Sequence, residues 1–233
     1  GELGRDGASF ELVDPETKLS HQYLSKPQYG ELRDVSLAIA KKYTHTQAYL
    51  IGVGRSAAPM ASFLELLGSN VAGYLPIDGL SRYVEGGKVK PLSAAQLQAF
   101  DEVFEAFIPP DALRGNRDVV LFQKSDSGDS LRLLKPVLQR WMAAKGYGNQ
   151  IKIVGMTTAD KQGPQAGLDD VMVFSSATFG EIGTRSFNLI APYEKFRPGS
   201  SKNGPNDLPY DLNRRPKPPA ANAKLFRASL KHR

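Results

Sequence analysis

The sequence predicts an α/β fold in which helices cover both faces of a mainly parallel β-sheet. Short, continuous apolar runs of strand length recur along the chain, and longer segments with helical periodicity separate them. This alternation is typical of right-handed strand-helix-strand units, which build a parallel sheet. With 233 residues, 41% of them hydrophobic, the chain can form one domain of ordinary core size.

The N-terminal segment, residues 1–30, mixes glycine, proline and polar residues and is expected to be an extended arm. From Glu31 the apolar spacing becomes helical and continues to Lys41-Lys42, where cations suit the negative end of a helix dipole. We expect the folded domain to span residues 31–192.

The first predicted strand, Ala48–Val53 (AYLIGV), is a continuous apolar run that should be buried on both faces. It leads into Gly54-Arg55-Ser56 and a helix opened by Pro59. Residues 71–77 predict a second strand, which Pro76 places at a sheet edge or ends early.

An insertion of about residues 78–115 separates these elements from the rest of the predicted sheet. It contains an irregular stretch, and then a helix that Ser93 caps and that continues to Phe107. The insertion is expected either to cover a ligand site or to bind a partner.

The second half of the predicted sheet has three further strands with one long helix among them. That helix carries Leu131, Leu134, Leu138 and Trp141 on one face, and Pro136 should kink or delay it. The strands are 118–122, 151–156 and 170–174.

The C-terminal segment, residues 193–233, predicts a basic, proline-rich tail. Ten Lys/Arg and three Asp/Glu in residues 194–233 give it a charge of +7, which leaves −1 for the rest of the formal +6. Its few large apolar side chains cannot bury enough surface to fold alone. The tail is expected either to bind a protein or RNA partner or to be solvated without a dedicated ligand.

Composition excludes several classes of site. The chain has no cysteine and three histidines, which excludes disulfides and cysteine-bound zinc and leaves little for a histidine metal cluster. We therefore expect no metal and no cofactor. No apolar run approaches the roughly 18 residues of a membrane span. A cytoplasmic protein without membrane contact is expected, although a targeting peptide removed before Gly1 would leave no trace here.

Two turns combine the residues that bind phosphate. Gly54-Arg55-Ser56 and Ser125–Ser130 (SDSGDS) each lie between a buried strand and a helix, where small residues let the backbone approach a ligand and hydroxyls can donate to phosphate oxygens. A phosphate monoester is the expected occupant. Asp126 and Asp129 oppose it unless their carboxylates point away or face sugar hydroxyls.

These segments resemble the SIS (sugar isomerase) family. Asp118–Ser130 (DVVLFQKSDSGDS) is similar to its strand and Ser-x-Ser-Gly-[Glu/Asn/Asp]-[Ser/Thr] phosphate loop, and Ala48–Ala57 (AYLIGVGRSA) to its first strand and Gly-x-Gly-Arg-Ser turn. Ile151–Thr158 and Asp170–Phe174 resemble later strands. Ile182–Arg185 is similar to a Gly-Thr-containing helix start in the family's hexulose-phosphate isomerases.

The resemblance implies an SIS-type three-layer α/β/α sandwich with a five-stranded, mainly parallel sheet, forming a homo-oligomer that binds a phosphorylated sugar. The implied function is sugar-phosphate binding, with aldose-ketose isomerisation if the protein is an enzyme. The residues implied to bind the phosphate or sugar are Gly54, Arg55, Ser56, Ser125, Ser127, Gly128, Asp129, Ser130 and Thr184.

The catalytic residues that the resemblance implies are only partly present. Hexulose-phosphate isomerases of the family carry a Phe-Glu pair after Gly-Thr-x, whereas Ser186-Phe187 stands there in this chain. Glu181 is the candidate base in its place, and His45, contributed across a dimer interface, is the candidate for ring opening.

Two other interpretations stay open at this point. One is a non-catalytic SIS-like structural or regulatory subunit of a larger, RNA-containing or protein assembly, anchored by its tail. The other is a type I phosphoribosyltransferase, because Asp126–Ser130 is also similar to the diphosphoribosyl loop of that family. Phe122-Gln123 stands where that family has two acidic residues.

Overall fold

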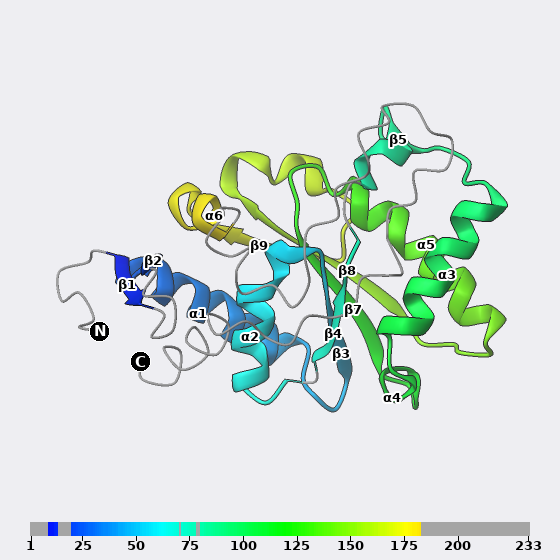
Figure 1. Ribbon diagram of the computed structural model, residues 1–233, viewed down its shortest axis with the longest axis horizontal. Helices are drawn as coiled ribbons and strands as arrows, with labels where there is room; N and C mark the ends of the chain where they lie inside the picture. The colour runs from blue at the N-terminus through cyan, green and yellow to red at the C-terminus, as the bar shows by residue number, and fades with distance from the viewer. Residues whose placement is uncertain (1–8, 14–19, 70, 78–79, 183–233) are drawn as a thin grey trace.

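The centre of the protein is a five-stranded parallel sheet with the strand order β4-β3-β7-β8-β9. The computed structural model shown in Figure 1 describes residues 9–13, 20–69, 71–77 and 80–182. The predicted α/β fold class is confirmed, and Pro76 does follow an edge strand. The strands are β3 (Ala48–Val53), β4 (Val71–Leu75), β7 (Asp118–Lys124), β8 (Ile151–Thr158) and β9 (Asp170–Phe174).

Helices cover both faces of this sheet and make three layers (Figure 1). One face packs against α1 (Lys26–Lys42), α2 (Ala58–Leu66) and α6 (Ser176–Ile182). The other packs against α3 (Ala94–Phe107), α4 (Pro110–Leu113) and α5 (Asp129–Ala144).

Side-chain alternation along the strands feeds the two cores. In β3, Leu50 contributes to the core under α1 and α2, and its neighbour Ile51 to the core under α3 and α5. In β7, Val120 and Leu121 divide in the same way. Since successive side chains of a strand point to opposite faces, a continuous apolar run is what a sheet covered on both sides requires.

Two helices begin at capping boxes. Ser93 accepts a hydrogen bond from the Gln96 backbone while the Gln96 side chain bonds back to Ser93, so α3 starts as predicted. Ser25 and Gln28 form the same box before α1, which therefore starts at Lys26 and not at Glu31. The Ser-x-x-Gln spacing is the sequence signal for this earlier start.

Two short hairpins lie where the sequence pattern predicted irregular chain. β1 (Ser9–Val13) and β2 (Ser20–Ser25) pair antiparallel within the expected arm. β5 (Val84–Glu85) and β6 (Lys88–Val89) pair around two glycines within the insertion. The remaining elements are short 3₁₀ helices, η1 (Arg55–Ala57), η2 (Leu80–Tyr83), η3 (Ala159–Lys161) and η4 (Gly163–Gln165).

Several expectations concern residues outside the described part of the chain. They include the basic tail, residues 193–233, and the phosphate ligand Thr184. The tail's partner, the homo-oligomer and the domain boundaries stay predictions. Among the described residues, no helix has the length and apolar character needed to cross a membrane.

Candidate functional site

The topology brings the two predicted phosphate turns to one edge of the sheet. β3 and β7 are parallel neighbours, with Gly52 opposite Phe122. Both turns therefore begin at the carboxyl ends of these two strands, at the same edge of the sheet. The turn after β3 leads to α2 on one face, and the turn after β7 leads to α5 on the other. This is the point where the strand order reverses, and ligands of doubly wound sheets bind in the crevice between such diverging turns.

The β7–α5 loop, residues 125–128, is held in place by Ser125. Gly128 adopts a left-handed backbone with φ of 79° and donates its N–H to Ser125 Oγ at 2.6 Å. The Ser125 N–H donates to the Met156 carbonyl at 2.8 Å. Ser125 is buried, so its hydroxyl shapes the loop first and retains one proton for a ligand.

Backbone donors gather where this loop enters α5. Within the described residues, the N–H groups of Ser127, Ser130 and Leu131 have no protein acceptor. The first N–H groups of a helix point along its axis and carry the positive end of its dipole. The loop thus presents uncommitted donors and the exposed Ser127 hydroxyl to the crevice.

The acidic side chain of the loop and that of the first residue of α5 are both paired with cations. Asp126 accepts a bond of 2.8 Å from Lys161, and Asp129 one of 3.2 Å from Arg132. Arg132 also donates to the carbonyls of Ser127 at 2.7 Å and Ala166 at 2.5 Å. The repulsion that these carboxylates would exert on an anion is therefore offset locally.

Lys124, the last residue of β7, is a site residue that the sequence analysis missed. Its Nζ lies 4.1 Å from the centroid of the Phe179 ring, and within the described residues it has no carboxylate in ion-pair distance. The pKa of Lys124 is lowered from its ordinary value. Burial is the main cause and the charge of Lys161 adds to it, while the charge of Asp126 acts in the opposite direction. The loop, with its acids paired, keeps this one additional positive charge. A lysine that ends an apolar strand directly before a Ser/Gly loop was the available signal.

A buried polar group lies beneath the loop on the α5 side of the sheet. Gln123 Oε1, Thr157 Oγ1 and Gln165 Oε1 are buried without a hydrogen-bond partner among the described residues. Gln123 pairs in register with Gly155, two residues before Thr157, and Gln165 donates to the Ser125 carbonyl at 3.3 Å. Unpaired buried acceptors of this kind are satisfied by an ordered water or a ligand donor.

The other predicted site residues are divided between the two ends of the molecule. Gly54, with φ of 72°, and Ser56 lie in the turn after β3, beside the β7–α5 loop. The Arg55 backbone is there too, and Glu181 lies in α6, but neither side chain is described. His45 is exposed in the turn before β3. The length of that strand, about 20 Å at 3.3 Å per residue, separates it from the loops of its own chain, and the contribution of His45 across a dimer interface stays a prediction.

Comparison with known proteins does not assign this chain to a family. No family model matches the chain, and no curated protein matches its sequence. Among solved structures it is similar to a hypoxanthine-guanine phosphoribosyltransferase from Bacillus anthracis str. 'Ames Ancestor'. The two chains are 15% identical with a TM-score of 0.39, and the match covers 70% of this chain and 82% of the other.

The assignment to the SIS family was wrong, and with it the sugar-phosphate isomerase and the SIS-like subunit. No family model matches, and the similar solved structure named above is that of a phosphoribosyltransferase. The physical reason lies in the segments that carried the resemblance. A buried strand that runs into a Ser/Gly loop and a helix N-terminus is used for phosphate by several α/β folds, so it indicates the architecture but does not distinguish the families.

Proposed function

We propose that this protein binds a mononucleotide or a related phosphoribosyl compound, with the phosphate of the ligand on the β7–α5 loop. The observation that carries this proposal is the loop itself. It combines left-handed Gly128, the open amides of Ser127 and Ser130, and the position of α5 directly after a central parallel strand. A phosphate accepts hydrogen bonds from several such amides at once.

Local charge favours a phosphate over a neutral group. Lys161 and Arg132 compensate Asp126 and Asp129, which leaves Lys124 to balance part of the ligand charge. A half-buried ammonium interacts more strongly with a phosphate than an exposed one, because water screens the pair less. The three donor types at the loop, namely amide, hydroxyl and ammonium, suit a dianion.

The nucleotide part of the proposal is supported by the strand order and by the loop sequence. Some doubly wound sheets with this order bind a mononucleotide at the switch point, which β3 and β7 form here. The segment 126–130 is similar to the diphosphoribosyl loop of type I phosphoribosyltransferases. Phe122 and Gln123 stand before this loop in place of an acidic pair, so we propose binding and not group transfer.

Isothermal titration calorimetry of the full chain tests this function. AMP, GMP, CMP and UMP are titrated beside the four nucleosides, and the best ligand is repeated with Lys124→Gln. Loss of one charge-assisted hydrogen bond should weaken its binding about tenfold or more. The matched control is Lys152→Gln, which removes the same charge from β8 near its amino end.

The proposal requires binding by at least one nucleotide, none by the nucleosides, and an unchanged affinity in Lys152→Gln. Absence of heat with all four nucleotides overturns it, as does equal binding of nucleotides and nucleosides. The cytoplasmic location expected from the sequence stays a prediction.

A further inference from the structure

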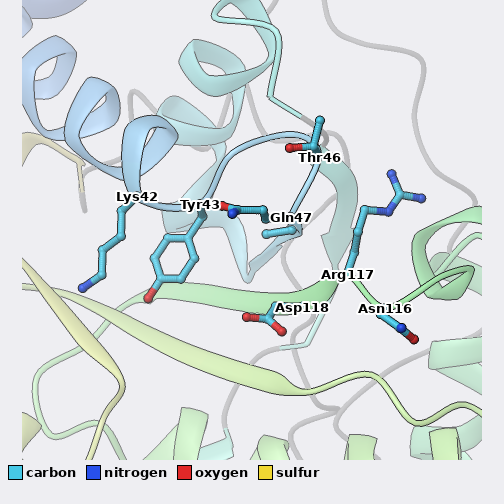
Figure 2. A pocket seen from close by; sticks show the side chains of 8 residues that line it. Lys42, Tyr43, Thr46, Gln47, Asn116, Arg117 and Asp118 are labelled. Atoms are coloured by element: carbon cyan, nitrogen blue, oxygen red, sulfur yellow. The ribbon is translucent and has the colours of Figure 1, made fainter.

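A second hollow lies at the opposite, amino-terminal edge of the sheet. It has a volume of about 570 Å³ and is formed by the end of α1, the start of β3 and the residues that lead into β7 (Figure 2). Small-molecule sites usually occupy roughly 300–1,000 Å³. The hollow therefore has room for a ligand, and none of the groups proposed to bind the nucleotide lines it.

Tyr43 forms the inner wall of this hollow, which we call the cleft. It is the C-cap residue of α1, only 8% exposed, and its backbone N–H donates to the Ile39 carbonyl at 2.8 Å. Burial first, and then the charges of Asp170, Asp169 and Asp118, raise the pKa of Tyr43 to about 12. The phenol thus stays protonated in a region where three carboxylates gather.

Two of these three carboxylates already have partners. Asp170 pairs with Lys42 at 2.6 Å, and Asp169 pairs with Lys135 at 3.5 Å and accepts the Ile153 N–H at 2.7 Å. For the Asp118 carboxylate, the described residues offer neither a hydrogen bond nor an ion pair. Asp118 is thus the uncompensated charge of the cleft.

The neighbouring cation does not compensate Asp118. The guanidinium carbon of Arg117 lies 3.9 Å from the centroid of the Tyr49 ring, and its Nη2 donates to the Asp111 carbonyl at 3.0 Å. Figure 2 shows the Arg117 side chain directed away from Tyr43 and Asp118. Adjacent residues at the start of a strand point to opposite sides, which explains this divergence.

We propose that this cleft binds a small organic cation, with a primary ammonium or guanidinium group on the Asp118 carboxylate. An aromatic wall and one unpaired carboxylate are the two features that recognise such a group, through cation–π attraction and a charge-assisted hydrogen bond. Tyr43, whose ring centroid lies 5.8 Å from the Lys42 ammonium, supplies the wall, and the Asn116 side-chain amide at the rim offers a further acceptor. Both head groups use the same chemistry at the carboxylate, and the experiment distinguishes them.

NMR titration of the ¹⁵N-labelled full chain tests the proposal. The probes are n-butylammonium and n-butylguanidinium, with 1-butanol as the neutral probe of the same chain length. A saturable shift of the amides of residues 43–48 and 116–118 is expected with at least one cation and not with the alcohol. Added salt should weaken it, because the cleft is open to water.

Two variants remove the site in different ways. Asp118→Asn keeps the side-chain shape and should weaken binding about tenfold or more, through loss of a charge-assisted hydrogen bond. Asn116→Trp fills the rim from an exposed position, so it removes the space without touching the core. The matched control is Asp34→Asn, which neutralises a carboxylate that is 66% exposed on α1 and pairs with Arg33.

Three results would each overturn the proposal: no shift with either cation, equal shifts with 1-butanol, or unchanged binding in both variants. Response to only one cation identifies the head group that the cleft takes. Nucleotide titration of Asp118→Asn keeps this site separate from the one at the other edge, since loss of cation binding should leave nucleotide binding intact.

Discussion

Gly155 and Gln165 meet closely beneath the β7–α5 loop. A Cβ atom on Gly155 would lie 2.7 Å from Gln165 Oε1 and 2.8 Å from Leu168 Cδ1. Gln165 is only 1% exposed, and its amide donates to the Ser125 carbonyl at 3.3 Å, so it has little freedom to move. Glycine in β8 is therefore what allows Gln165 to support the loop.

Gly155→Ala should lower the free energy of unfolding by about 1–3 kcal/mol, the usual cost of overpacking a buried site. Urea denaturation measures it, with Gly148→Ala as the control, because a Cβ there meets nothing within 4 Å. In a Gly155→Ala/Gln165→Ala double variant the two effects should not add, since the clash with Gln165 is gone. Full additivity would show that Gln165 is not the obstacle.

The conformation of Gly128 makes a prediction for ligand binding. Its φ of 79° costs an alanine roughly 1–2 kcal/mol, and a Cβ there would lie 3.1 Å from an Arg132 nitrogen. Gly128→Ala should therefore destabilise the protein and disturb the loop that we propose to bind phosphate. Gly146→Ala carries the same strain, at φ of 81°, in open space.

Calorimetry with the best nucleotide then separates strain from binding. Both variants should lose similar stability, but only Gly128→Ala should lose affinity. If Gly146→Ala loses as much affinity as Gly128→Ala, the effect comes from general destabilisation and not from the loop.

The fold was readable from the sequence because its strands are apolar on both faces. Ala48–Val53 and Asp170–Phe174 were predicted with the bounds that they have, since no other element gives short apolar runs between glycine-rich turns. The β1–β2 hairpin was missed because the polar residues of Ser20–Ser25 hide the alternation of a strand.

The site was only partly readable, for a different reason. The residue types of Ser125–Ser130 predict a phosphate loop. The pairing of Asp126 with Lys161 could not be predicted, because it joins residues 35 positions apart. The contact of Lys124 with the Phe179 ring likewise joins residues far apart in the sequence. The family was misread because this loop is shared by unrelated α/β folds, and the cleft at the other edge has no sequence signal at all.

The titration of Lys124 predicts how nucleotide binding depends on pH. Burial lowers the pKa of Lys124 below its ordinary 10.5, so the ammonium loses its proton earlier than an exposed lysine. AMP affinity should fall as the pH rises through that lowered pKa, while the phosphate, with a second pKa of about 6, stays a dianion. Lys124→Arg should keep its affinity over this range, and a parallel fall in the variant would show that another group is responsible.

Glu31 joins α1 to the start of α6. Its carboxylate accepts hydrogen bonds from the Ser175 backbone N–H, from Ser175 Oγ at 2.7 Å and from Thr178 Oγ1 at 2.5 Å. Burial alone would raise the pKa of Glu31, but the bonds from Thr178 and Ser175 lower it below its ordinary 4.5. The stabilisation is therefore present above pH 4.5 and is lost as the pH falls through the lowered value.

Glu31→Gln should lower the free energy of unfolding at pH 7 by about 1–3 kcal/mol and flatten its dependence on acid pH. Urea denaturation at a series of pH values measures both. Glu102→Gln serves as the control, because Glu102 accepts one bond of 3.3 Å from Gln98. An acid dependence as steep in Glu31→Gln as in the unchanged protein would assign it to other carboxylates.

Tyr43 predicts the behaviour at the alkaline end. Its pKa is raised from 10.0 to about 12, first by burial and then by the charges of Asp170, Asp169 and Asp118, so the folded state favours the protonated phenol. The sign follows: the stabilisation is complete below pH 10 and is lost as the pH rises toward 12. Tyr43→Phe should remove the last step of an ultraviolet phenolate titration and reduce the loss of stability over that range.

Tyr147→Phe, at a half-buried position on the other side of the sheet, is the control. If the step near pH 12 persists in Tyr43→Phe, the phenol does not lie among the three carboxylates, and the aromatic wall of the cleft must be reassigned.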